Sequence, residues 1–157
     1  MSADARLNQR LVELGWTLPA APEPKGLYRP IAILEKLAYT AGHLPIRADG
    51  TLITGRLGEG LAVAAGQIAA RWAALGILAT LQRELGAIDR VGRLVKLIGF
   101  VNSTPDFTQQ PAVINGCSEL LSEVFGPDAG VGVRSAVGTN TLPLGAAVEI
   151  EAVFALK

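Results

Sequence analysis

Arg134 and Glu149 are the two residues of this chain whose types and setting could do chemistry. Arg134 interrupts VRSAVG, a run that otherwise predicts a strand over residues 133–138. Glu149 lies in AVEIEAVFAL, a second predicted strand over 147–156. A guanidinium binds a carboxylate through two parallel hydrogen bonds, and a carboxylate can act as a general base toward water. The pair therefore predicts a site that grips a small carboxylate ligand beside a base.

The alternation of side chains along a strand predicts where these two residues point. In the last strand the apolar residues share the face that packs on the helices, so Glu149 belongs to the other face. If the strand of 133–138 lies near it in the sheet, Arg134 also points away from the helices. The residue types leave a second interpretation open, in which the two side chains form an ion pair with each other between strands or subunits.

Apolar periodicity, capping residues and turn residues predict the elements that must position this pair. Ser2 is a suitable N-cap for a first helix. The predicted helices cover residues 3–14, 60–85 and 111–125. The predicted strands cover residues 28–34 and 37–46, which form a hairpin turning at Glu35 and Lys36, a brief stretch near Leu52, and residues 90–102, 133–138 and 147–156.

This order predicts an α+β fold in which the last two helices lie on one face of a mixed sheet. The other face then needs a cover, and another subunit is the natural one. A chain of 157 residues is about one domain long. Residues 1–25, helical and then proline-rich, are predicted to be an N-terminal extension, and residues 26–157 to form the main domain.

Composition excludes several classes of partner. Lysine plus arginine and aspartate plus glutamate both total 14, so the formal net charge is zero and a nucleic-acid partner is not expected. Residues 1–16 mix both charges and do not resemble a secretory signal. The longest strongly apolar stretch, WAALGILATL, has about ten residues, fewer than a membrane span needs. We therefore expect a cytoplasmic protein without a membrane or nucleic-acid partner.

The other chemically capable residues predict less. His43 is the single histidine, and such a residue is more often hydrogen-bonded within the structure than catalytic. Cys117 is the single cysteine and falls on the inward side of its helix, as a buried small apolar residue would. One histidine and one cysteine do not make a metal cage, so no metal is expected. GRLGEGLAVAAG lacks the lysine and Ser/Thr of a phosphate-binding loop.

The C-terminal segment VRSAVGTNTLPLGAAVEIEAVF resembles the signature of the RidA/YjgF family of reactive intermediate deaminases, also labelled endoribonuclease L-PSP. That signature is an Arg-Ser-x-Val strand, a Leu-Pro-x-Gly loop and a Val/Ile-Glu-Ile-Glu strand at this spacing. FVNSTPDF and YTAGHLPI resemble two further family motifs in the right order. The resemblance runs from about Gly26 to the C-terminus, and it identifies the chain as a divergent, longer member.

The resemblance implies a chorismate-mutase-like α+β fold, assembled as a homotrimer whose sites lie at the subunit interface. It also implies hydrolysis of reactive enamines and imines, such as 2-aminoacrylate and 2-imino acids, to 2-keto acids and ammonia, with no cofactor or metal. Arg134 would bind the substrate carboxylate, and Glu149 would hold and polarise the attacking water. Further substrate contacts are implied for Tyr28, Gly42, His43, Asn115 and Ala136.

Three positions depart from the family pattern. Ala136 stands where many members have cysteine, Ala41 where they have serine, and His43 where glutamine is usual. A cleft that is wider and more apolar at 41 and 136 predicts a preference for larger 2-imino acids. The alternative function is a non-catalytic binder of small carboxylate metabolites, which needs Arg134 but could dispense with Glu149. In a purely structural or partner-binding trimer, the two side chains would neutralise each other and no cavity would form.

Overall fold

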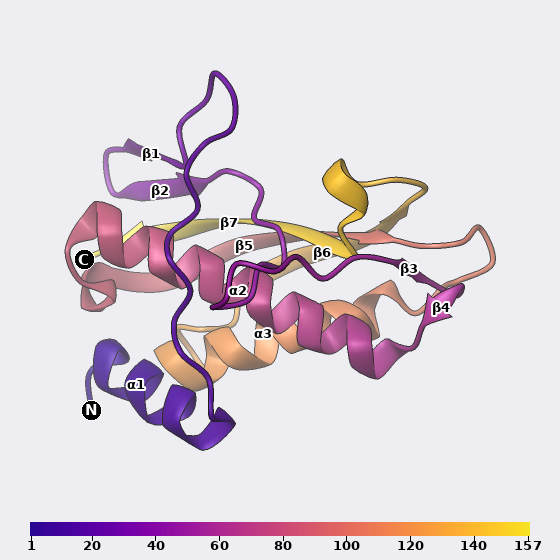
Figure 1. Ribbon diagram of the computed structural model, residues 1–157. Coiled ribbons are helices and arrows are strands. Elements are labelled where there is room, and N and C mark those ends of the chain that lie inside the picture. Colours follow the sequence, from indigo (N-terminus) through magenta and orange to yellow (C-terminus); the bar gives the residue numbers. More distant parts are fainter.

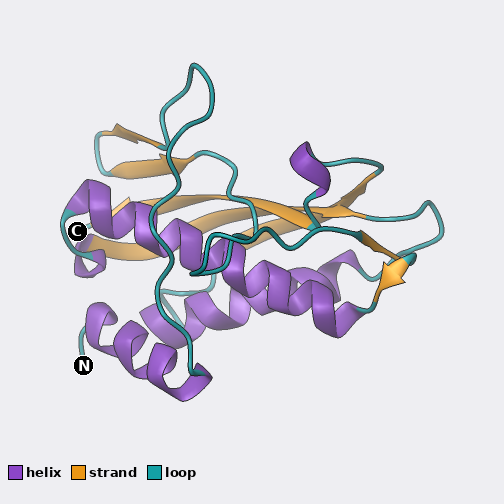
Figure 2. Cartoon of the chain, viewed as in Figure 1, coloured by secondary structure: helices purple, strands orange, loops and turns teal.

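The structure is a computed structural model that describes all 157 residues, and a five-stranded sheet with helices on one face forms its framework (Figure 1, Figure 2). The strand order is β1-β2-β7-β5-β6. These strands are β1 (Ile31–Leu34), β2 (Leu37–Thr40), β5 (Val91–Asn102), β6 (Val133–Thr139) and β7 (Val148–Leu156). A separate two-stranded ladder joins β3 (Arg56–Leu57) and β4 (Gly60–Leu61).

The helices are α1 (Ala3–Leu14), α2 (Val63–Leu85) and α3 (Gln110–Phe125), with 3-10 turns η1 (Ile88–Arg90) and η2 (Pro143–Gly145). Figure 1 shows all three α-helices on the same side of the sheet, with α1 farthest from it. In the sheet β5 and β6 pair in parallel and the other neighbours pair antiparallel. The predicted α+β class, with helices on one face of a mixed sheet, is therefore confirmed.

The core lies between the sheet and the α2/α3 layer. From Trp72 to Leu81 every residue of α2 is buried, because the helix is covered by the sheet, by α3 and by the loops around it. By length and composition α2 alone among the helices could cross a membrane, yet 67% of its most apolar stretch is buried inside the protein. It is the core helix of a soluble-protein fold.

Small residues let α2 and α3 approach closely. A Cβ at Gly116 on α3 would meet the main-chain carbonyl of Gln67 on α2, and a Cβ at Gly66 would lie 2.9 Å from a methyl group of Leu57 and 3.0 Å from one of Val113. Because a backbone atom cannot move aside as a side chain can, the contact at Gly116 fixes the distance between the two helices.

Replacing Gly116 with alanine should therefore destabilise the protein, although alanine is the better helix former. We expect Gly116→Ala to lower the free energy of unfolding by about 1–3 kcal/mol, the usual cost of overpacking. Urea unfolding followed by circular dichroism measures this. On the same helix Glu119→Ala removes only an exposed ion pair with Arg71 and should stay within about 0.5 kcal/mol of wild type. Equal stability of the two variants would contradict the close approach.

The N-terminal helix matches its prediction and also joins the core. The Ala5 N–H donates to the hydroxyl of the N-cap Ser2 at 3.1 Å. Leu7 is 2% exposed and belongs to the same apolar cluster as the sheet and α3. The Ala3 N–H also donates to Asp89 Oδ1 at 2.6 Å, which fastens the start of α1 to η1.

Three strand predictions need correction in detail. The hairpin turn at Glu35 and Lys36 is confirmed, but β1 begins at Ile31, because Pro30 has no N–H for a ladder. Leu52 makes only an isolated bridge to Ile46, while β3 and β4, which were not predicted, follow it. The strand predicted over residues 90–102 is β5, but it is not regular, because a bulge turns both Leu94 and Leu97 inward.

Candidate active site

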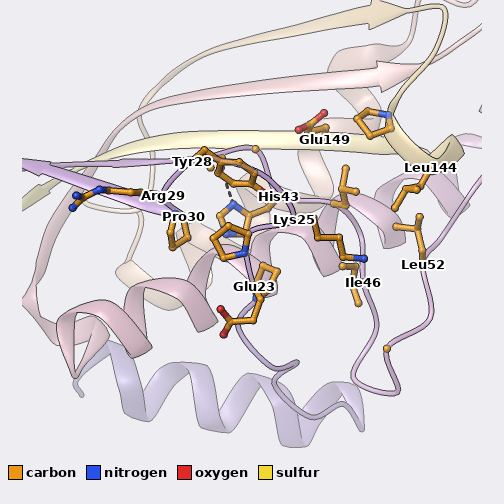
Figure 3. A pocket seen from close by; sticks show the side chains of 17 residues that line it. Glu23, Lys25, Tyr28, Arg29, Pro30, His43, Ile46, Leu52, Leu144 and Glu149 are labelled. Carbon is orange, nitrogen blue, oxygen red and sulfur yellow. Dashed lines mark hydrogen bonds between the residues drawn. The ribbon is translucent and has the colours of Figure 1, made fainter.

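A cavity of about 690 Å³ opens beside the N-terminal half of β7 (Figure 3). One wall consists of Glu149 and the loop that follows β2, which includes Gly42 and His43. The opposite wall comes from the segment before β1. Apolar side chains close the rest: Leu44, Ile46, Leu52 and Leu144, together with several prolines.

Glu149 is the carboxylate that faces this cavity. It is half-buried on β7, between the buried Val148 and Ile150, so strand alternation directs it away from the core. Its carboxylate has no hydrogen-bond or ion-pair partner within the chain. Burial raises the pKa of Glu149 above its ordinary value, and the negative charge of Glu151 on the same face raises it further. Such a group is suited to take a proton from bound water.

Gly42 gives that carboxylate its room. A Cβ at position 42 would collide with the Glu149 carboxylate. The Gly42 backbone cannot shift away easily, because its neighbour His43 is hydrogen-bonded to β7. The His43 N–H donates to the Ile150 carbonyl at 2.7 Å, and the Ile150 N–H donates to the His43 carbonyl at 3.0 Å. The loop is thus fixed directly against the strand that carries Glu149.

His43 is held as a neutral residue. Its side chain is 2% exposed. Nδ1 lies 2.8 Å from the Ala41 carbonyl, which can only accept, so Nδ1 carries the proton and Nε2 accepts from the Thr80 hydroxyl, also at 2.8 Å. Burial lowers the pKa of His43 from 6.5 to about 4. With both ring nitrogens occupied, His43 positions the loop and presents only a ring surface to the cavity.

The lowered pKa predicts a pH dependence of stability. Between pH 6.5 and about 4 the unfolded chain binds a proton at residue 43 that the folded chain does not, so stability falls as the pH falls through this window. We expect the loss to be roughly 3 kcal/mol for this residue. His43→Gln, which cannot titrate, should lose that much less between pH 7 and pH 4 in urea unfolding. Identical pH profiles for both proteins would contradict the assignment.

Tyr28 lies at the mouth of the cavity. Its side chain is 53% exposed, and Figure 3 shows its ring between Glu149 and Pro30. Four of the seven residues singled out in the sequence therefore meet in one place: Tyr28, Gly42, His43 and Glu149.

Arg134 lies elsewhere, and its predicted direction is wrong. In the parallel pairing of β6 with β5, Arg134 is in register with Leu97, which is buried under the helices. Paired residues share a face, so Arg134 leaves the sheet on the helix side. There its guanidinium donates to the Ser118 hydroxyl at 3.0 Å and to the Pro111 carbonyl at 3.3 Å, both on α3. The error arose because alternation within one strand does not say which of its faces is inward.

Asn115 and Ala136 lie with Arg134. Helical spacing places Asn115 on the same side of α3 as Pro111 and Ser118, and Ala136 follows Arg134 on the same face of β6. Cys117, adjacent on α3, is fully buried, and burial raises its pKa to about 12, so it is no nucleophile. Within one chain the predicted residues thus form two clusters, which we term the glutamate cluster (Tyr28, Gly42, His43, Glu149) and the arginine cluster (Asn115, Arg134, Ala136).

The two clusters are well separated. Arg134 and Glu149 pair with Leu97 and Phe100 of β5, from opposite sides of that strand. Two strand spacings across and three residues along place their Cα atoms roughly 14 Å apart. Their side chains leave opposite faces of the sheet, so the ion-pair interpretation does not hold within one chain.

Comparison with known proteins decides the family. The sequence profile described as "YjgF/chorismate_mutase-like, putative endoribonuclease" matches residues 8–155. The chain belongs to the RidA/YjgF family. The family prediction is confirmed, and the match begins well before Gly26, where the motif resemblance started.

Relatives agree along nearly the whole chain. Protein TCP17 of Trypanosoma cruzi is 44% identical over 155 residues, which cover 99% of this chain and 97% of TCP17. The structure of Atu1372 from Agrobacterium tumefaciens, a protein of unknown function, has 39% identity, a TM-score of 0.90 and coverage of 99% and 95% of the two chains. A "putative endoribonuclease" of Shewanella oneidensis has 30% identity, a TM-score of 0.89 and coverage of 96% and 99%.

Part of the cavity of this RidA/YjgF member was not predictable from the residue pattern. Residues 22–25, Leu52 and Leu144 line it, but none was predicted to. The prolines at 22 and 24 indicated an extended connector without showing where it runs. Nothing in the sequence of Leu144 distinguishes it from a core leucine.

Proposed function

We propose that the protein hydrolyses reactive enamines and imines derived from amino acids, such as 2-aminoacrylate and 2-imino acids, to 2-keto acids and ammonia. The observation that carries the proposal is Glu149, a half-buried carboxylate with a raised pKa and no partner, facing a cavity. Partner-free carboxylates in such surroundings are typical of general bases.

The reaction needs little beyond positioning. The carbon of a protonated imine is already electrophilic, so water attacks it once Glu149 has accepted one of the water protons. Glu149 then returns this proton to the amine nitrogen of the adduct, and the carbon–nitrogen bond breaks as the hydroxyl of the adduct becomes the keto group. The hydroxyl proton goes to the released ammonia, so the products are a 2-keto acid and ammonia in its protonated form. Neither a cofactor nor a metal takes part in this scheme. A cytoplasmic location would suit the proposal, since amino acid-derived imines arise in metabolism there.

The substrate carboxylate needs a cation in a fixed orientation. Lys25 and Arg29 line the same cavity, but no hydrogen bond or ion pair within the chain fixes either side chain. Arg134 fits this role because its guanidinium is exposed and fastened to α3 in a fixed orientation. We therefore place Arg134 of one subunit opposite Glu149 of the next, in a homotrimer. The helix-free face of the sheet supports such an assembly, because it exposes a row of large apolar side chains: Leu34, Tyr39, Val133 and Val137.

Glu149→Gln should lose activity while it gains stability. Folding raises the pKa of Glu149, so the ionised carboxylate costs stability at neutral pH, and the neutral amide does not. We expect turnover of imines made in situ by an amino-acid oxidase to fall by about 10²–10⁴-fold and the melting temperature at pH 7.5 to rise. Full turnover by this variant would contradict the role of Glu149 as general base.

Glu151→Gln is the matched control for that variant. Glu151 lies on the same face of β7, two residues further on, and its charge raises the pKa of Glu149. Removing the charge should leave turnover intact and move the acid limb of the pH–rate profile to lower pH. An unchanged acid limb would show that another group governs it.

Mixing variants tests the placement between subunits. Arg134→Ala and Glu149→Gln should each be inactive alone, yet co-expressed subunits should recover about a quarter of wild-type activity, because a random trimer pairs an intact Arg134 with an intact Glu149 at one interface in four. Arg10→Ala, which removes another arginine that contacts α3 through Glu123, should stay active alone. Mixtures that remain inactive would place both residues in one subunit's site.

A non-catalytic carboxylate binder is the alternative. The Escherichia coli protein TdcF, whose structure has a TM-score of 0.62 to this chain at 22% identity, was solved with bound serine, which carries a carboxylate. A binder would retain affinity for 2-keto acids in Glu149→Gln and hydrolyse no imine. The ribonuclease label of the family has less support, since equal numbers of basic and acidic residues do not favour RNA binding.

A further inference from the structure

The segment between α1 and β1 forms the outer wall of the cavity. After Gly15, Trp16 stacks on Trp72 of α2, with ring centroids 4.5 Å apart and an angle of 18° between the rings. Farther on, Glu23 binds Arg83 of α2 at 2.8 Å. Figure 1 shows this chain crossing over α2 toward the hairpin of β1 and β2. We refer to residues 22–25, the part that lines the cavity, as the arm.

The space that the arm encloses is mainly apolar. The carboxylate of Glu23 is paired with Arg83, and Figure 3 shows the side chains of Glu23 and Arg29 directed away from the centre of the cavity. Figure 3 shows the aliphatic side chains of Ile46, Leu52 and Leu144 around the cavity beside Glu149. The prolines Pro22 and Pro24 of the arm also line it. Lys25 is the cation that remains on this wall, exposed and without an ion-pair partner.

Leu144 has a backbone conformation and an exposure that are unusual for a leucine. Its backbone is left-handed, with φ 59° and ψ 15°, and its side chain is 69% exposed at the cavity. A Cβ makes that conformation unfavourable, and an exposed side chain gains no core packing in return. Strain at a site that no core contact explains is typical of ligand-binding positions. An apolar ligand group lying on Leu144 would use the side chain that the fold leaves in water.

The volume agrees with a large ligand. Within one chain the cavity measures about 690 Å³, the size of a site for a drug-sized molecule. A three-carbon imino acid together with Arg134 of a neighbouring subunit would leave much of it filled with water. We propose that the cavity is a side-chain subsite for substrates with large apolar side chains, and that Leu144 and the arm determine this specificity. The inference rests on the proposed function for its reaction, and it adds the substrate class.

The experiment compares kcat/KM for imino acids made in situ from leucine, alanine and glutamate. Wild type should prefer the leucine-derived substrate over the alanine-derived one by about tenfold or more, the usual range for added methylenes in an apolar pocket. Leu144→Gly should lower the leucine-derived value by about tenfold and leave the alanine-derived value nearly unchanged. Its melting temperature should stay level or rise, because glycine relieves the left-handed backbone.

Three companion variants sharpen the result. Leu144→Ala keeps the backbone strain and should lose the same preference without the gain in stability. Glu23→Ala removes the ion pair of the arm with Arg83 and should lower the preference in part. Val12→Ala removes an apolar side chain that is 81% exposed on α1, outside the cavity, and should behave as wild type.

Binding of the stable products separates the two proposals. Calorimetry with 4-methyl-2-oxopentanoate and pyruvate needs no catalysis. If no imine is hydrolysed but 4-methyl-2-oxopentanoate binds more tightly to wild type than to Leu144→Gly, the result supports the subsite and contradicts the deaminase function. Hydrolysis without any size preference would overturn the subsite and leave the function. A preference for the glutamate-derived imine that Lys25→Ala abolishes would also overturn it, in favour of an anionic side chain.

Discussion

Strand β7 is paired along both edges, with β2 on one side and β5 on the other. Because its alternate residues Val148, Ile150, Ala152 and Phe154 are all buried, a slip of one position would carry every one of them to the opposite face. The same register directs Glu149 outward. The main-chain bonds between His43 and Ile150 then add a third constraint beyond the end of β2. Hydrophobic burial thus fixes the direction of the one carboxylate that faces the cavity.

The chain divides its chemistry between two places in this sheet, the central strand β7 and the edge strand β6. The glutamate cluster forms where the loop after β2 meets β7, and the arginine cluster forms where edge strand β6 meets α3. Each is rigid by itself: Gly42 is constrained by the His43 bonds, and Arg134 by two acceptors on α3. A site assembled from such pieces, as proposed above, would need little further ordering at Gly42 and Arg134.

Much of this architecture was predictable from sequence. Helical periodicity located α2 and α3, Ser2 marked the start of α1, and the C-terminal motif identified the family. The direction in which the Arg134 side chain points was harder to predict. Most residues of its strand are exposed on both faces, and only the pairing with Leu97 reveals which face is inward. The walls of the cavity were harder still. They come from segments such as residues 22–25, whose position depends on remote contacts with Trp72 and Arg83 and leaves no local pattern.

Two contacts hold the segment between α1 and β1 against α2, and they differ in physical kind. The Trp16–Trp72 stack is an apolar contact that salt does not weaken. The ion pair of Glu23 with Arg83 lies at the surface, where the Glu23 side chain is 84% exposed. Counterions screen such a pair over about 8 Å at physiological ionic strength and over shorter distances as salt is added. Rising ionic strength would therefore weaken the charged contact and leave the aromatic one intact, so how firmly residues 22–25 are held beside the cavity depends in part on the surrounding electrolyte.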